Sequence, residues 1–173
     1  MSISVRDMTL DDIPAVASCQ RAAFRHPFDQ AVLTHEFLGC HRFNPDTLLV
    51  AVDENDAVVG TIWGAWNGRR AVISGLAVHP SYQGHGIARR LITTVEERFR
   101  AKGVTRLSLE ITADNHRVIP LYENLGFRVK EGIMSMGKTS TPRTALPYPS
   151  SRDRHGPAPD RYLCLQEAGQ RRA

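Results

Sequence analysis

The chain has 173 residues, of which 42% are hydrophobic and 23% charged, values typical of one globular domain with a single core. No run approaches the roughly 20 consecutive apolar residues of a membrane span, and the first residues lack the order of a signal peptide. We therefore expect a soluble, cytoplasmic protein, one domain over residues 1–173, with no membrane partner. Its three cysteines, which have neither disulfide-framework nor zinc-ligand spacing, are Cys19, Cys40 and Cys164.

The formal net charge of +4 is confined to the C-terminal part of the chain. Residues 1–137 carry 15 basic and 15 acidic side chains, so the positive excess lies in residues 138–173. Within this part, residues 138–160 are rich in proline and serine, which predicts a long basic loop. The segment lacks the interleaved aromatic residues of a stacking platform, so we expect no nucleic-acid partner.

The first half of the sequence mixes strand and helix patterns. Residues 3–5 alternate as a short strand, and Thr9 followed by acidic residues marks the start of a helix predicted from about Asp11 to Ala23. A weaker helical pattern covers Asp29–Leu38. Three strands separated by polar turns are then predicted at Leu48–Val52, Ala57–Trp63 and Ala71–Val78.

After Gly84 the apolar residues change to a helical period. They recur at every fourth position and predict an amphipathic helix that ends at Gly103: Ile87, Leu91, Val95 and Phe99. A strand is predicted over 107–112, with Glu110 on the face opposite its apolar residues, and a short helix then ends at Gly126. Two further strands are predicted at 127–129 and 161–166. These elements indicate one mixed sheet with helices packed on it.

The segment before the amphipathic helix has the features of a ligand-binding site. A strand ends, Pro80 reverses the chain, and Gly84 and Gly86 precede the helix, whose free N–H groups and dipole can bind a diphosphate. Tight packing of the turn against the helix would explain the two glycines equally. The pattern is not a dinucleotide-binding fingerprint, because Arg89 stands where the third glycine is required. It is not a P-loop either, because no Gly-Lys-Ser or Gly-Lys-Thr closes it.

Two blocks of the sequence resemble one enzyme family. Gln83, Gly86 and Ala88, at their spacing after a strand, resemble the acyl-CoA signature of the Gcn5-related N-acetyltransferases, the GNAT superfamily. The segment from Asn115 to Phe127, with its Leu-Tyr pair and terminal Gly-Phe, resembles the later motif of that family. The resemblance covers about residues 3–129. It implies an α+β GNAT fold, with one mixed, mostly antiparallel sheet of six to seven strands flanked by about four helices.

By this resemblance the cosubstrate is acetyl-CoA, and no metal is implied. The N–H groups of 83–89 would bind the diphosphate, and the backbone of 76–78 would pair with the pantetheine arm as an added strand. The Val78 amide would polarise the thioester carbonyl. Asn115 would contact the pantetheine, with capping of the following helix as the alternative. The implied cofactor-binding residues are Leu76, Ala77, Val78, Gln83, Gly84, His85, Gly86, Ile87, Ala88, Arg89 and Asn115.

Two residues match catalytic positions of the family. Tyr122 matches the general acid that protonates the departing thiolate, and an ordinary core aromatic is its alternative role. Glu110 stands where amino-terminal acetyltransferases of the family place a carboxylate base, and a solvent-facing strand residue is the alternative. Pro120 removes an N–H group, so we expect an irregular first turn or a helix that begins closer to Pro120. Three histidines near these positions have no metal-ligand spacing: His79, His85 and His116.

The sequence therefore predicts an acyl-CoA-dependent N-acetyltransferase, in which a primary amine attacks the thioester directly. The segment 26–28 and the helix predicted after it are similar to the first helix-loop-helix of the ribosomal-protein and amino-terminal acetyltransferases. The acceptor is then a peptide or protein amine, and a small-molecule amine is the open alternative. A non-catalytic acyl-CoA sensor or scaffold is the rival function, and the sequence leaves a homodimer open.

Overall fold

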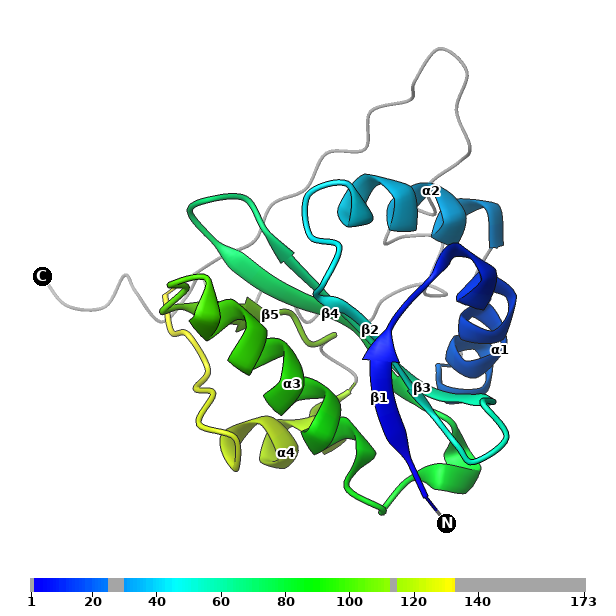
Figure 1. Ribbon diagram of the computed structural model, residues 1–173. Helices are drawn as coiled ribbons and strands as arrows, with labels where there is room; N and C mark the ends of the chain where they lie inside the picture. The colour runs from blue at the N-terminus through cyan, green and yellow to red at the C-terminus, as the bar shows by residue number, and fades with distance from the viewer. Residues whose placement is uncertain (1, 25–29, 113–114, 133–173) are drawn as a thin grey trace, which may run out of the picture. The chain divides into compact units, whose positions relative to one another are not determined.

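The computed structural model describes residues 2–24, 30–112 and 115–132, which are built around one sheet (Figure 1). Its five strands are β1 (Ser4–Asp7), β2 (Leu48–Val52), β3 (Val58–Trp66), β4 (Ala71–Val78) and β5 (Leu107–Leu109), and they lie in that order. The helices are α1 (Ile13–Ala23), α2 (Gln30–His41), α3 (Ile87–Ala101) and α4 (Ile119–Glu123). Three 3₁₀ turns are η1 (Leu10–Asp12), η2 (Pro80–Tyr82) and η3 (His116–Val118).

The two faces of the sheet bury separate apolar clusters. One cluster joins α3 to the sheet, and Tyr122 of α4 and Phe127 just beyond that helix pack against it. The other joins α1 and α2 to the opposite face. Helix α3 approaches β3 closely, because a Cβ atom added to Gly64 would lie 2.9 Å from Phe99 and from Val95. Glycine at this position therefore sets the distance between the helix and the sheet.

The sheet is mixed and mostly antiparallel, as expected. All neighbouring strands pair antiparallel except β4 and β5, which pair in parallel. The described part has five strands, so the count of six to seven is not confirmed. The strand predicted over 107–112 ends at Leu109. The loop predicted at 138–160 and the strand predicted at 161–166 lie outside the described residues.

The strand predicted at 127–129 is wrong, because these residues are irregular. The amide of Phe127 donates to the carbonyl of Tyr122 (3.0 Å), and the amide of Gly126 donates to Glu123 (2.9 Å). Gly126 has a φ of 90°, the left-handed conformation that ends a helix. The backbone at Phe127 is therefore used to finish α4, and Val129 is 73% exposed.

The start of α1 is fixed by a nearly buried carboxylate. Both oxygens of Asp12 accept hydrogen bonds from the guanidinium of Arg6, at 2.8 and 2.9 Å. The backbone amide of Thr9 also donates to Asp12 (2.7 Å). Although burial acts to raise it, these hydrogen bonds hold the pKa of Asp12 below its ordinary value of 3.8. The pair thus connects β1 to the first turn of the helical layer.

Strand β4 contains a bulge that separates its two halves. Thr61 pairs with Ala77 and Trp63 with Ser74, so two residues of β4 face one residue of β3. Gly75 lies at this bulge with a φ of 59°. The pairing of β4 with β5 covers only 71–73 of β4 and therefore ends before the bulge. Beyond it, the described part of the chain provides no strand partner for the β5 side of β4.

Candidate functional site

The C-terminal half of β4 presents its backbone to the unpaired edge. The amide of His79 donates to the carbonyl of Val59 on β3 (2.9 Å). Because successive residues of a strand direct their N–H and C=O groups to opposite edges, those of Val78 face away from β3. The side chains of Leu76 and Val78 pack against the α3-side cluster, while Ala77 is buried. A single extended chain could therefore add to this edge.

The loop between β4 and α3 is exposed and folded on itself. The side chain of Gln83 donates through Nε2 to the carbonyl of Val78 (3.0 Å). Nδ1 of His79 accepts from the amide of Ser81 (3.3 Å) and begins η2. The ring of His85 turns back to the loop, with Nδ1 2.9 Å from the carbonyl oxygen of Gln83. These bonds hold the loop beside the end of the free β4 edge.

Gly84 and Gly86 are required by backbone conformation. Their φ angles are 80° and 76°, in the left-handed region. A Cβ atom added to either would meet nothing within 4 Å, so close packing of the turn does not explain these glycines. The space beside the loop is open, and residues 83–86 are exposed.

The loop delivers the chain into the first turn of α3, which has 15 residues. The amide of Arg90 donates to the carbonyl of Gly86 (3.0 Å) and so makes the first hydrogen bond of the helix. The amides of Ile87, Ala88 and Arg89 therefore have no acceptor within the helix. Ile87 is buried in the core, whereas Arg89 is exposed. Free amides, the helix dipole and open space together can bind a diphosphate.

Asn115 lies at the start of η3, where its backbone amide donates to the carbonyl of Thr112 (2.9 Å). Its side chain makes no capping hydrogen bond, so the capping role is not observed. Helix α4 begins at Ile119 with Pro120 as its second residue, as the missing N–H group of proline predicts. The helix is therefore short and follows a 3₁₀ turn.

Tyr122 belongs to α4 and packs against the α3-side cluster, to which Leu76, Val78 and Ile87 also belong. Its ring meets that of Phe127 edge to face, with centroids 5.7 Å apart. Within the described residues its hydroxyl has no hydrogen-bond partner, and burial raises the pKa of Tyr122. The hydroxyl therefore keeps its proton at neutral pH and can donate it.

Glu110 is exposed and lies one residue beyond β5. Leu107 and Leu109 pack against the α3-side cluster, whereas the hydroxyl of Ser108 donates to the carbonyl of Ala71 (3.1 Å). The structure thus brings Leu76, Val78 and Ile87 into one cluster with Tyr122, whereas Glu110 is exposed.

Two features of this region were not predicted from the sequence. Tyr82 donates its hydroxyl hydrogen to Asp53 Oδ2 (3.0 Å), a contact between residues 29 positions apart. The other is the bulge at Gly75. A glycine inside a predicted strand is a recognised sign of a bulge and could have indicated it, whereas no local pattern signals the contact of Tyr82.

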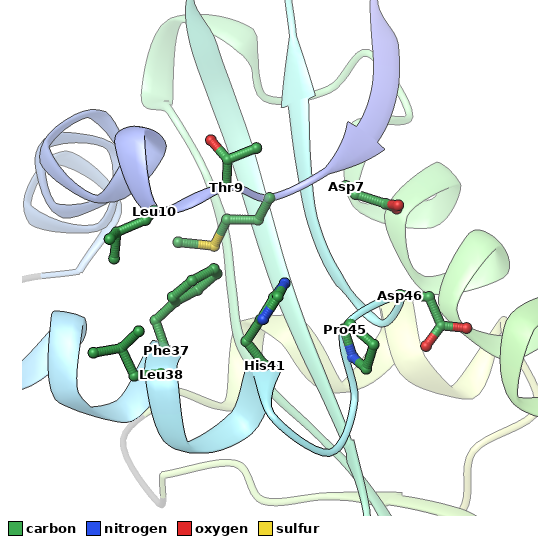
Figure 2. A pocket seen from close by; sticks show the side chains of 9 residues that line it. Asp7, Thr9, Leu10, Phe37, Leu38, His41, Pro45 and Asp46 are labelled. Carbon is green, nitrogen blue, oxygen red and sulfur yellow. The ribbon is translucent and has the colours of Figure 1, made fainter.

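A cavity lies elsewhere, between the turn before α1 and the end of α2 (Figure 2). It has a volume of about 540 Å³ and is lined by Met8, Leu10, Phe37, Leu38 and His41 among others. The ring of His41 stacks on that of Phe37, with centroids 5.0 Å apart. No residue predicted for the site lines this cavity. It therefore adds nothing to the candidate site.

The described residues contain neither a metal-binding group of side chains nor a membrane-spanning helix. This part of the chain contains no group of three or more His, Cys, Asp or Glu side chains arranged to hold a metal ion. None of the helices in residues 2–24, 30–112 and 115–132 has the length and apolar character needed to cross a membrane.

Comparison with known proteins gives one family. The model described as "Acetyltransferase (GNAT) family" matches residues 13–127. "Acetyltransferase SG1711" of Sodalis glossinidius (strain morsitans) is 38% identical over 95 residues, which are 55% of this chain and 66% of that protein. An "Acetyltransferase" of Yersinia pestis (strain Pestoides F) is 37% identical over 95 residues, with the same coverage of 55% and 66%.

Solved structures share the fold. Ard1 from Thermoplasma volcanium superposes with a TM-score of 0.67 and 24% identity, covering 75% of this chain and 85% of that one. The ribosomal-protein-S18-alanine N-acetyltransferase from Escherichia coli superposes with a TM-score of 0.62 and 22% identity, covering 73% and 78%. A NatC complex bound to Gag peptide and CoA has a TM-score of 0.63 and 23% identity, covering 75% and 87%.

Proposed function

This chain belongs to the acetyltransferase (GNAT) family, and we propose that it transfers an acetyl group from acetyl-CoA to a primary amine. The observation that carries the proposal is the edge of β4 beyond its bulge, which has no strand partner among the described residues and leads to the amides at the start of α3. One ligand with an extended arm and a diphosphate would satisfy both features. CoA has this form.

The residues of the loop and the helix start would hold the donor. The amides of 83–89 would bind the diphosphate, aided by the helix dipole. The backbone of Leu76, Ala77 and Val78 would pair with the pantetheine arm, whose amides supply the matching donors and acceptors. Asn115, whose side chain is free of a capping bond, would contact the same arm.

The transfer would be direct. The amine nitrogen attacks the thioester carbonyl, the C–S bond breaks, and the acetyl group forms an amide while CoA leaves as a thiol. The amide of Val78, directed to the free edge, would stabilise the oxyanion. Glu110 would take the proton of the amine, directly or through water, and Tyr122 would protonate the departing thiolate. The rest of the rate enhancement would come from holding both substrates in place.

The acceptor is proposed as an amine of a peptide or of a small molecule. Ard1 and the S18-alanine acetyltransferase share this fold, and the name of the second states a protein acceptor. Peptides with free α-amino groups are therefore the first acceptors to test. The rival sensor function has no observation in its favour beyond the same donor site.

Thermal unfolding with ligands tests the donor site first. We expect CoA and acetyl-CoA to raise the melting temperature, because each binds only the folded protein, while a nucleotide without the pantetheine arm gives a smaller rise. Thiol release with peptides and small amines in the same samples then tests transfer. Stabilisation without release from any amine would favour the sensor function. The absence of stabilisation by either CoA species would contradict the proposal.

A further inference from the structure

The loop that begins the candidate site is tied to a distant turn by one side chain. Tyr82, the last residue of η2, donates its hydroxyl hydrogen to Oδ2 of Asp53 across 3.0 Å. Its ring packs against the α3-side cluster and meets the ring of His79 edge to face, with centroids 6.0 Å apart. The ring therefore has a fixed position, and its hydroxyl reaches out of the loop to the turn between β2 and β3.

Asp53 is held rigidly by the turn in which it lies. Its Oδ1 accepts hydrogen bonds from the amides of Asn55 (2.9 Å) and Ala57 (3.0 Å), and its own amide donates to the carbonyl of Ala57 (3.0 Å). The hydrogen bonds from Ala57 and Asn55 lower the pKa of Asp53, so the carboxylate is charged at neutral pH. One oxygen thus organises the turn, and the other is available to Tyr82.

The other side-chain bonds of the loop are local. Gln83 bonds to Val78, Ser81 to His79, and His85 lies against Gln83. These contacts define the shape of the loop and join it to the end of β4, but they connect it to no segment distant in the sequence. Among the described residues, the Tyr82 bond is the one side-chain hydrogen bond that joins 80–86 to a segment distant in the sequence.

We propose that the hydrogen bond between Tyr82 and Asp53, here called the latch, holds residues 83–86 in the conformation that binds the donor's diphosphate. The inference rests on the proposed function. Both glycines of this segment have left-handed φ angles and no neighbour at their Cβ positions, so side-chain packing does not restrain them. A restrained loop has less conformational entropy to lose on binding, and this preorganisation increases affinity. Tyr82 is thus a positioning residue, which acts through the loop.

The test compares CoA with a ligand that retains the pantetheine arm but lacks the diphosphate and the nucleoside attached to it. Tyr82→Phe retains the ring and removes the hydroxyl. We expect the Kd of CoA, measured by calorimetry, to rise roughly three- to tenfold, the range for loss of one hydrogen bond. The affinity for S-acetylpantetheine, which has no diphosphate, should not change. General loosening of the fold would weaken both ligands alike.

Two further variants control the result. Asp53→Ser retains an oxygen that can accept from the turn amides but is too short to reach Tyr82. Tyr82→Phe should therefore add no further loss in the Asp53→Ser background. Thr94→Ala removes a hydroxyl that bonds within α3, to the carbonyl of Arg90 (2.8 Å), and should leave the Kd of CoA unchanged.

The outcomes separate the latch from the proposed function. If the wild-type protein binds CoA and Tyr82→Phe binds it equally well, the proposed role of the latch is wrong, whereas the proposed donor site is retained. An equal rise in the Kd values of CoA and S-acetylpantetheine for Tyr82→Phe would also overturn the proposed role of the latch. If the wild-type protein binds neither ligand, the proposed function fails, and the role of the latch in donor binding fails with it.

Discussion

The carboxamide of Gln83 donates a hydrogen bond to the carbonyl oxygen of Val78, although one residue begins the exposed loop and the other ends β4. The bond connects the two parts of the proposed donor site, which are the free edge of a strand and the amides of a loop. It also occupies the carbonyl of Val78 and leaves the amide of that residue for a ligand. The geometry of the site is thus partly assembled before any ligand binds.

Replacement of Gln83 by Met should weaken CoA binding with little effect on folding, because the bond is exposed and contributes about 0.5–1.5 kcal/mol. Gln83→Glu should weaken CoA binding further, since a carboxylate cannot donate to a carbonyl and repels the diphosphate. Calorimetric Kd values for CoA measure both variants. Equal affinities of the wild type and Gln83→Glu would mean that this side chain has no part in the donor site.

Gly84→Ala should lower the free energy of unfolding by about 1–2 kcal/mol, since an L-residue is strained at a φ of 80°. Gly39→Ala is the matched control. Gly39 lies inside α2, and a Cβ atom there would meet nothing within 4 Å. Alanine at this position should therefore raise the free energy of unfolding by roughly 0.5–1 kcal/mol. Urea unfolding measures both. A stabilising effect of alanine at position 84 would show that the loop does not have this conformation.

Asp12→Asn should destabilise the protein at pH 7 by roughly 1–2 kcal/mol, because it removes the charge that pairs with Arg6. The folded protein holds the pKa of Asp12 below 3.8, so near that pH the unfolded chain binds more protons. The stabilisation is therefore present above about pH 4 and is lost as the pH falls through the folded pKa. Urea unfolding at pH 7 and pH 3 should show the wild type approaching the variant at the lower pH. A constant difference between them would contradict the ion pair.

Tyr122→Phe should lower kcat by about 10²-fold or more, the contribution of a general acid, while the Kd of acetyl-CoA changes little. Burial raises the pKa of Tyr122, so the rate should not fall from its deprotonation up to pH 9. Stopped-flow thiol release across pH 6–9 measures this. A kcat within twofold of the wild type would make Tyr122 an ordinary core aromatic.

Glu110→Gln should reduce the rate most at low pH, where the amine is protonated and needs a base. The difference should shrink as the pH rises past the amine's own pKa, about 8 for an α-amino group. Glu54→Gln, which changes an exposed carboxylate in the turn between β2 and β3, is the control for charge alone. An effect of Glu110→Gln that is independent of pH would exclude the role of base.

The elements with a strong local pattern could be predicted from the sequence. The fourfold spacing from Ile87 to Phe99 predicted α3, and the structure has it at Ile87–Ala101. The missing N–H group of Pro120 correctly predicted where α4 begins. In each case a short segment contains all the information, because periodicity and proline act within one or two turns.

The features that depend on distant partners could not be predicted. Residues 127–129 have the composition of a strand, but the backbone at Phe127 is used to end α4. The contact of Tyr82 with Asp53 joins segments 29 residues apart. The bulge at Gly75 exists only in relation to β3, since a bulge is a mismatch between two strands. Tertiary pairing determines such features, and one sequence without its pairing contains no direct record of them.

The bulge at Gly75 also changes the phase of β4. In a regular strand, residues an odd number of positions apart point to opposite faces, yet Ile73 and Leu76 both contact the α3-side cluster. If β4 were regular through Gly75, Leu76 and Val78 would point away from that cluster, and the amide of Val78 would turn toward β3. One extra residue thus lets the same strand keep its core packing and still offer a backbone edge to a ligand.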